Sequence, residues 1–121
     1  MKRDMELIRE ILFFVEESCD GTQYVSVEKA HLHERDSDII YEHCRLLADK
    51  KLVIATLTDD KQCYFDSLTW DGHDFLDNAR NSTVWSATKK AAGQLSFGVF
   101  QEVLKQSAIE FAMNTLKGVF R

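Results

Sequence analysis

The chain has 121 residues, 45% of them hydrophobic and 29% charged, a composition typical of a single soluble globular domain. Fifteen Lys and Arg residues against twenty Asp and Glu residues give a net charge of −5, so a strongly basic nucleic-acid footprint is absent. No apolar run reaches the ~18 residues of a membrane span, and the N-terminus turns acidic too early for a signal peptide. We therefore expect a cytoplasmic protein with no membrane partner.

The reactive side chains form no catalytic or metal-binding pattern. Cys19, Cys44 and Cys63 are odd in number and widely spaced, which disfavours a disulfide scaffold and a zinc ribbon and favours reduced thiols. Motifs of nucleotide-binding enzymes, esterases and metalloproteases are absent. His31-x-His33 could share a metal only on an extended segment, and solvated histidines in a turn are the commoner arrangement. We expect no enzyme activity and no cofactor.

The charge distribution sets the expected domain organisation. Residues 1–81 carry 10 basic and 18 acidic side chains, a net charge of −8, whereas residues 82–121 carry 5 and 2, a net charge of +3. The absence of proline favours continuous helices joined by short turns. We predict one domain over residues 1–81 and a C-terminal helical extension over residues 82–121.

The first predicted helix covers residues 4–17, where apolar residues from Met5 to Val15 recur at spacings of three and four. Phe13 falls among the charged residues of its outer face. That aromatic ring is either singly exposed or part of an interface.

A short strand over residues 23–25 and a brief helix from Ser26 to about residue 33 are predicted next. A longer helix follows from Asp36 or Ser37 as N-cap through Lys50. Its inward face is predicted to carry Ile39, Ile40, His43, Cys44, Leu46 and Leu47. Its outward face is predicted to carry Asp38, Tyr41, Glu42, Arg45 and Asp49. The neighbours His43 and Cys44 could suggest a Cys-His nucleophile, but adjacent helical side chains point about 100° apart. Because both fall on the inward face, we interpret them as packed core residues.

Residues 52–57 and 63–68 are strand-like, and the polar residues 58–62 between them indicate the tip of a hairpin. Thr69 is the predicted N-cap of a helix that reaches residue 81. Trp70 and Trp85, which flank that helix, are predicted to anchor it to the core.

A further helix is predicted around residues 84–92, followed by Gly93 as a stop and Ser96 as the cap of a last helix to about residue 118. The last helix carries two opposite apolar stripes. One contains Phe97, Phe100, Leu104, Ala108 and Phe111; the other contains Ile109, Met113, Leu116 and Phe120. One core can cover one stripe, so the second is covered either by other helices of the chain or by another copy in a homo-oligomer. The oligomer interface would then include Phe13, Ile109, Met113, Leu116 and Phe120.

The order of these elements predicts an α+β, mostly helical fold with a winged helix-turn-helix core, a two-stranded wing and C-terminal helices. The helix over residues 36–50 takes the position of the recognition helix, and residues 58–62 form the wing tip. The segment Leu68-Thr69-x-x-Gly72-x-x-x-Leu76 resembles one found after the wing in many bacterial winged-helix regulators.

Four segments together resemble the bacterial and phage family known as domain of unknown function 2513. They are residues 1–9, residues 41–47 followed by Leu52-Val53, residues 68–77, and Arg80-x-x-Thr83-Val84-Trp85. The resemblance implies a small intracellular protein of bacterial or prophage origin with a winged-helix core. It does not indicate what the protein does, because the family is uncharacterised. Lys50-Lys51 departs from the family, which usually has a small residue and a glycine there.

Two functions follow from this reading. DNA binding would use Tyr41, Arg45, Lys50, Lys51 and Lys61. The outward face of the recognition helix sums to −2 and the wing tip to −1, which opposes contact with phosphates. The alternative is a protein-interaction adaptor that uses this acidic surface and the C-terminal helix.

Overall fold

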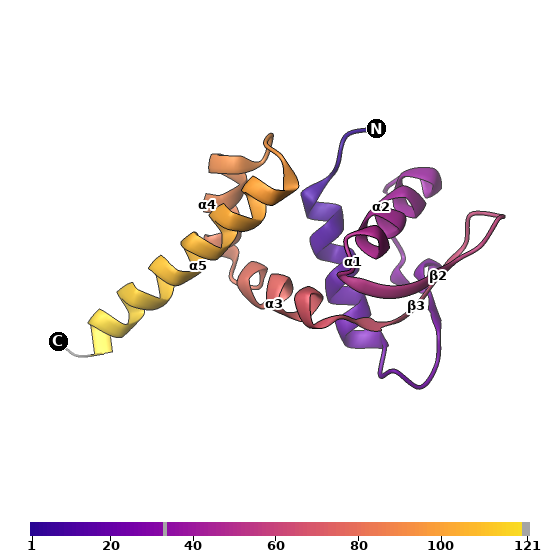
Figure 1. Cartoon of the computed structure of the whole chain (residues 1–121), viewed down its shortest axis with the longest axis horizontal. Helices are drawn as coiled ribbons and strands as arrows, with labels where there is room; N and C mark the ends of the chain where they lie inside the picture. The colour runs from indigo at the N-terminus through magenta and orange to yellow at the C-terminus, as the bar shows by residue number, and fades with distance from the viewer. Residues whose placement is uncertain (33, 120–121) are drawn as a thin grey trace. The chain divides into compact units, whose positions relative to one another are not determined.

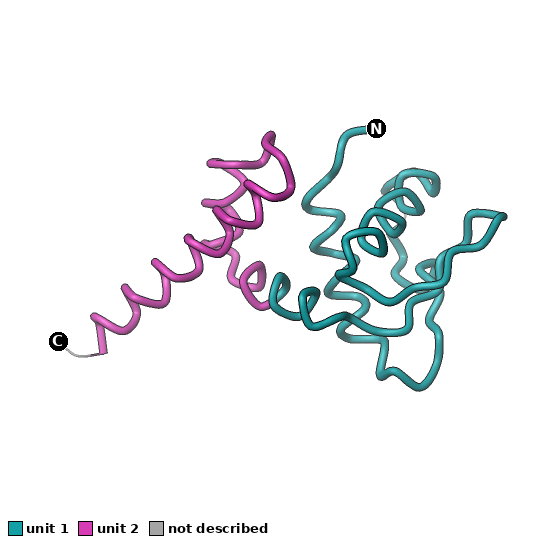
Figure 2. The backbone as a smooth tube through the Cα atoms, viewed as in Figure 1, with its two compact units in different colours: residues 1–76 teal, residues 77–121 magenta. Residues whose placement is uncertain are grey.

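The computed structural model describes residues 1–32 and 34–119. These residues form five α-helices and a three-stranded antiparallel sheet, so the predicted α+β class is confirmed (Figure 1). Two compact units, residues 1–76 and 77–121, divide the chain (Figure 2). The division falls within a helix, five residues before the predicted boundary after residue 81. None of the described helices is long and apolar enough to cross a membrane.

The helices of the first unit begin at the caps that the sequence indicates. In α1 (Met5–Ser18), the Asp4 carboxylate accepts a hydrogen bond from the Leu7 N–H at 3.1 Å. Ser26 caps the 3-10 helix η1 (Val27–Ala30) in the same way, and Asp36 caps α2 (Ser37–Asp49). Helix α1 packs against α2 and β3.

The sheet has the strand order β1-β3-β2, with β1 at Val25–Ser26, β2 at Val53–Leu57 and β3 at Cys63–Leu68. Ile54 pairs with Ser67 and Ala55 with Phe65, so Asp66 is the extra residue of a β-bulge. The bulge lets Cys63, Phe65 and Leu68 all face the core although their spacing changes from two to three.

The core of the first unit consists of one face of α1, the inner face of α2 and the inner side of the sheet. Its buried apolar side chains include Leu7, Ile8, Ile11, Leu12, Val15, Cys44, Leu47, Leu52, Val53, Cys63 and Phe65. The Phe14 ring also meets Phe65 edge-on, with 6.4 Å between the ring centroids. Cys19, Cys44 and Cys63 are free thiols, as the sequence predicts.

The segment from Leu68 to Leu76 joins β3 to α3 (Trp70–Ala79) by a close backbone approach. Thr69 donates its N–H to the Leu52 carbonyl at 3.1 Å and its hydroxyl to the Lys51 carbonyl at 2.5 Å, and it caps Gly72 N–H at 3.0 Å. A Cβ on Gly72 would lie 1.9 Å from the Leu52 carbonyl oxygen. Only glycine therefore allows the first turn of α3 to lie this close to the start of β2.

Lys51 occupies a left-handed backbone position between α2 and β2, with a φ of 61°. Residues with a Cβ rarely adopt this region, and glycine adopts it readily. A glycine would therefore adopt this conformation with less strain than the lysine that occupies it.

The second unit contains a helical hairpin of α4 (Ser82–Ala92) and α5 (Phe97–Val119). Asn81 caps α4, and the Ser96 hydroxyl accepts the Val99 N–H at 3.2 Å at the start of α5. Trp85 packs edge-on against Phe100 with 5.4 Å between ring centroids. Trp85 is buried, with 2% exposure, but its ring packs on α5, so its predicted role in anchoring the helix over residues 69–81 stays a prediction.

Two predictions about burial are wrong. Trp70 is 83% exposed, because the inward positions of α3 are Gly72, Phe75 and Leu76, and Trp70 lies about half a turn from them. Ile39, predicted to face inward, is 39% exposed because it lies in the first turn of α2, where the buried stripe begins only at His43.

Candidate functional site

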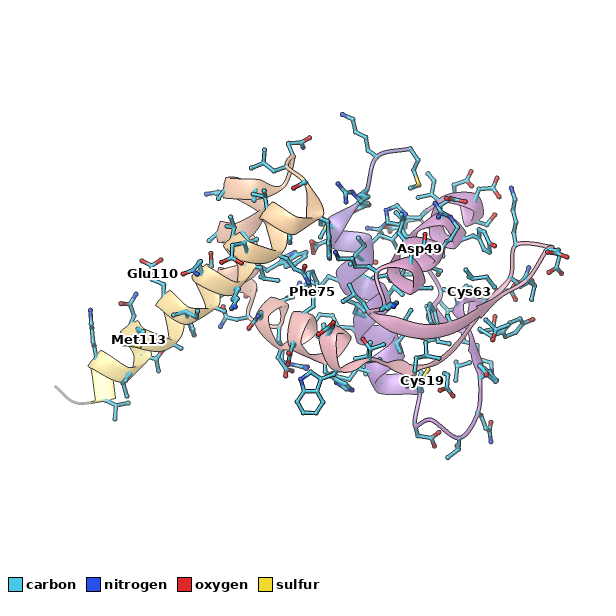
Figure 3. All side chains as sticks on the ribbon, in the orientation of Figure 1. Cys19, Asp49, Cys63, Phe75, Glu110 and Met113 are labelled. Atoms are coloured by element: carbon cyan, nitrogen blue, oxygen red, sulfur yellow. The ribbon has the colours of Figure 1, made fainter. Side chains whose placement is uncertain are left out.

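The candidate site is the surface formed by the outward side of α2 and the tip of the β2–β3 hairpin, here called the α2 surface. It consists of Asp38, Tyr41, Glu42, Arg45, Asp49, Asp59, Asp60 and Lys61. The first five of these side chains lie on α2 and face outward, because His43, Cys44 and Leu47 turn the opposite face of the helix into the core. Asp49 is labelled on this helix in Figure 3.

Arg45 is held along the helix by two carboxylates. Its guanidinium donates to Glu42 at 2.8 and 3.0 Å and to Asp49 at 2.8 Å. The hydrogen bond from Arg45 lowers the pKa of the Glu42 carboxyl, and the same pair raises the pKa of Arg45. Glu42 and Arg45 therefore stay charged near neutral pH, and the N–H donors of Arg45 are occupied by acceptors on its own helix.

The hairpin tip brings a lysine to the first turn of α2. Lys61 has a left-handed φ of 62°, and its N–H donates to the Thr58 carbonyl at 3.1 Å to close the turn. Its ammonium lies 3.4 Å from the Asp38 carboxylate. This ion pair links the tip to α2, and it places the one cation of the tip against a carboxylate.

The remaining predicted cations lie at the other end of α2. Lys50 is the C-cap of the helix and Lys51 follows it, and both are exposed. About 18 Å of helix separates them from Asp38 and its partner Lys61, at 1.5 Å per residue. The structure thus places these predicted cations at opposite ends of α2. The eight side chains of the α2 surface sum to a charge of −3, and Lys50 and Lys51 bring the sum to −1.

A groove of about 430 Å³ adjoins the hairpin side of α2. Tyr41 and Lys61 both line it, so the structure brings these two predicted residues together. Val27, Leu32 and Ile40 give the groove apolar walls, and Glu28 and Arg35 add charges. The Arg35 guanidinium is itself paired with Glu10 at 3.0 Å and Asp4 at 3.4 Å.

His43 and Cys44 lie in the core, as the sequence predicts. The His43 ring accepts the Asp4 N–H at Nε2 over 2.7 Å and donates from Nδ1 to the Ile39 carbonyl over 2.8 Å. A hydrogen bond with Cys63, together with burial, raises the pKa of the Cys44 thiol, which stays protonated. Both residues therefore contribute to the packing of the core. His33, the other half of the considered metal pair, lies outside the described residues.

The residues predicted for an oligomer interface have different surroundings. Phe13 is half-buried, with the Arg9 guanidinium 5.2 Å from its ring centroid. Ile109, Met113 and Leu116 are 46–49% exposed on α5. Phe120 lies outside the described residues.

The outer face of the sheet carries an exposed apolar area that was not predicted from the sequence. Tyr24 is 61%, Ile54 51% and Tyr64 36% exposed. The alternation Cys63-Tyr64-Phe65 carried the signal for Tyr64, since its two neighbours are both buried. No pattern in the sequence marks Tyr24.

Comparison with known proteins identifies a family. The family model described as hypothetical protein DUF2513 matches residues 2–98. The chain belongs to this family of unknown function. An uncharacterized protein of Haemophilus influenzae is 31% identical over 111 residues, which cover 89% of this chain and 92% of that protein. No solved structure matches the chain.

Proposed function

We propose that the chain is a non-enzymatic winged-helix adaptor that binds a protein partner carrying a basic surface. The observation that carries the proposal is the pairing of the α2 surface: Arg45 lies between Glu42 and Asp49, and Lys61 lies against Asp38. The surface therefore offers surplus carboxylates to a partner.

The winged-helix assignment rests on the order of elements in the first unit. A helix, a short strand, a helical turn and a longer helix precede a two-stranded hairpin, and the short strand pairs with the second hairpin strand. This order puts α2 in the recognition-helix position, with residues 58–62 as the wing tip. The partner surface of such a fold is set by the side chains on α2 and the wing.

Electrostatics favours a protein partner over DNA. Neutralisation of phosphates supplies most of the nonspecific affinity of DNA-binding proteins. The α2 surface has a charge of −3, and the unit that contains it, residues 1–76, has 9 basic and 17 acidic side chains. Basic side chains of a protein would gain from these carboxylates, and the apolar walls of the adjoining groove suit a neighbouring apolar side chain of the same partner.

The test compares two fluorescent probes at low and high salt: a basic peptide of alternating Lys and Leu residues, and a random DNA duplex. We expect binding of the peptide at micromolar concentration with loss at high salt, and no binding of the duplex. The double variant D38K/E42K should weaken peptide binding at least about tenfold, a loss of ~1.4 kcal/mol. The matched control D74K reverses an exposed acidic residue on α3 and should leave the affinity within about twofold. Equal effects of the two variants, or tighter binding of the duplex, would overturn the proposal.

The second candidate function is DNA binding, favoured by the exposed Lys50 and Lys51 beside the end of α2. In that case the duplex binds with a steep salt dependence, and R45E abolishes the binding. A duplex affinity unchanged by R45E would remove α2 as the DNA-reading helix.

A further inference from the structure

The second half of α5 has no covering element within its own unit. Helix α4 has 11 residues and α5 has 23, so at 1.5 Å per residue α4 is about 16 Å long and α5 about 34 Å. The buried residues of α5, Phe100 and Leu104, both lie in its first half. Every residue from 109 to 119 is exposed, and Figure 1 shows α5 extending past α4.

The exposed half of α5 is apolar on the side opposite to α4. Ile109 is 47%, Met113 49% and Leu116 46% exposed. Their spacing of four and then three is the a/d spacing of a coiled coil. At about 100° per residue they lie on the side of the helix opposite to Phe100 and Leu104. Phe111 is also exposed, but it lies on the same side of the helix as Phe100 and Leu104 and does not belong to this face.

We propose that this face of α5 pairs with the same face of a second copy of the chain, and that the two helices run antiparallel. Met113 of each copy then packs against Leu116 of the other. The chemistry of the face is self-complementary, as a twofold interface requires. Antiparallel pairing also opposes the two helix dipoles.

The charges beside the apolar residues are complementary in an antiparallel pair. Glu110 and Lys117 each follow a d-type residue, Ile109 and Leu116, so they lie on the same flank of the seam. In an antiparallel pair this flank faces itself, and Glu110 meets Lys117 of the second copy twice. In a parallel pair Glu110 meets Lys105, also twice, and Lys117 meets the uncharged Ala112. Both orientations therefore form two ion pairs, and the opposed helix dipoles favour the antiparallel one. Glu110 and Met113 are labelled on this part of α5 in Figure 3.

The size of the face predicts a modest affinity. The segment from 109 to 119 is about 15 Å long, so each copy contributes only about three helical turns. Interfaces of this size lie at the low end of the specific range and dissociate at micromolar concentrations. The proposal concerns α5 alone and does not depend on the function of the α2 surface.

Sedimentation equilibrium of the full chain from about 10 to 300 µM tests the pairing, since this range brackets a micromolar dissociation constant. We expect a dimer at the upper end. M113D should raise the dissociation constant by about 100-fold or more. The control N114D adds the same charge to the next exposed residue, which points away from the seam, and should change it by less than about threefold. Circular dichroism checks that both variants keep the helix. A monomer at 300 µM, or equal effects of the two variants, overturns the proposal.

A charge swap tests the orientation independently of core packing. E110K and K117E should each weaken the dimer by about threefold to tenfold, and the double variant E110K/K117E should return it to within about twofold of the original. A parallel dimer would respond differently, because Lys at position 110 would face Lys105 in the double variant. Failure of the double swap to restore affinity rejects the antiparallel pair.

Discussion

Gly72 allows a direct test of the close approach between α3 and the start of β2. The substitution G72A adds one methyl group at a point where the backbone of α3 lies against β2. Its Cβ would lie 1.9 Å from the Leu52 carbonyl oxygen and 3.0 Å from the Leu52 carbonyl carbon. Because the obstacle is backbone, no side-chain rotation relieves the contact.

The expected cost follows from the distance that must be gained. An ordinary contact begins at 3.4 Å, so the two elements must separate by about 1.5 Å. That movement would break the hydrogen bond from Thr69 N–H to Leu52, now 3.1 Å, and the one from the Thr69 hydroxyl to Lys51, now 2.5 Å. Two hydrogen bonds contribute about 1 kcal/mol each, and disturbed packing costs about 1–3 kcal/mol. The better helix propensity of alanine returns about 1 kcal/mol, which leaves a net loss of about 2–4 kcal/mol.

Urea unfolding followed by circular dichroism measures this loss. Two controls separate the clash from other effects. G98A, in α5, adds a methyl group with nothing within 4 Å and should be neutral or stabilise the protein by up to about 1 kcal/mol. H73A changes the exposed neighbour on α3 and should stay within about 0.5 kcal/mol. A G72A variant as stable as the unsubstituted chain would refute the close-approach argument.

Three further predictions concern α1, α2 and the thiols. H43L leaves the Asp4 N–H without its 2.7 Å acceptor and should cost about 1–2 kcal/mol in the same urea assay; unchanged stability would contradict the role of the ring. D4A removes the cap of α1 and should cost about 1 kcal/mol at pH 7. Burial raises the pKa of the Asp4 carboxyl, but the hydrogen bond from the Leu7 N–H and the charge of Arg35 outweigh burial and lower the pKa overall. The stability that the charged carboxylate provides is therefore present above the pKa of an unfolded Asp, about 3.9, and is lost as the pH falls below that value. The gap between D4A and the unsubstituted chain should therefore narrow at pH 3, and a constant gap would argue against the charge. A disulfide thiol reagent at pH 8 should react slowly with Cys19, whose pKa is raised by burial and by Asp66, and should reach Cys44 and Cys63 only in denaturant. Rapid reaction of all three thiols in the folded chain would contradict this.

The sequence predicted the elements best where local chemistry decides them. Ser26, Asp36 and Ser96 were identified as caps because a short polar side chain at a helix start satisfies the backbone N–H groups that follow it. The hairpin strands were found from their β-branched and aromatic residues, and the structure begins β2 only one residue later, at Val53. These features depend on neighbours in the sequence and need no knowledge of the tertiary structure.

Features that depend on distant partners were missed or only partly predicted. Trp70 was assigned to the core because of its size, but the approach of Gly72 to Leu52 fixes the rotation of α3 and leaves the indole exposed. The pairing of Lys61 with Asp38 joins residues 23 apart and has no local signature. The pairing of Arg45 with Glu42 and Asp49 was not predicted either, although their spacing of three and four permits it.

The ion pairs around Arg45 have a consequence for the choice of partner. Glu42 and Asp49 reach solvent and take no part in the core, so substitution of both by their amides would leave the buried residues of α2 untouched. Those two changes would bring the outward face of α2 from a charge of −2 to neutral and release the guanidinium. Two exposed substitutions on α2 would therefore remove the charge on which the proposed choice of partner depends, and the buried residues would not have to change.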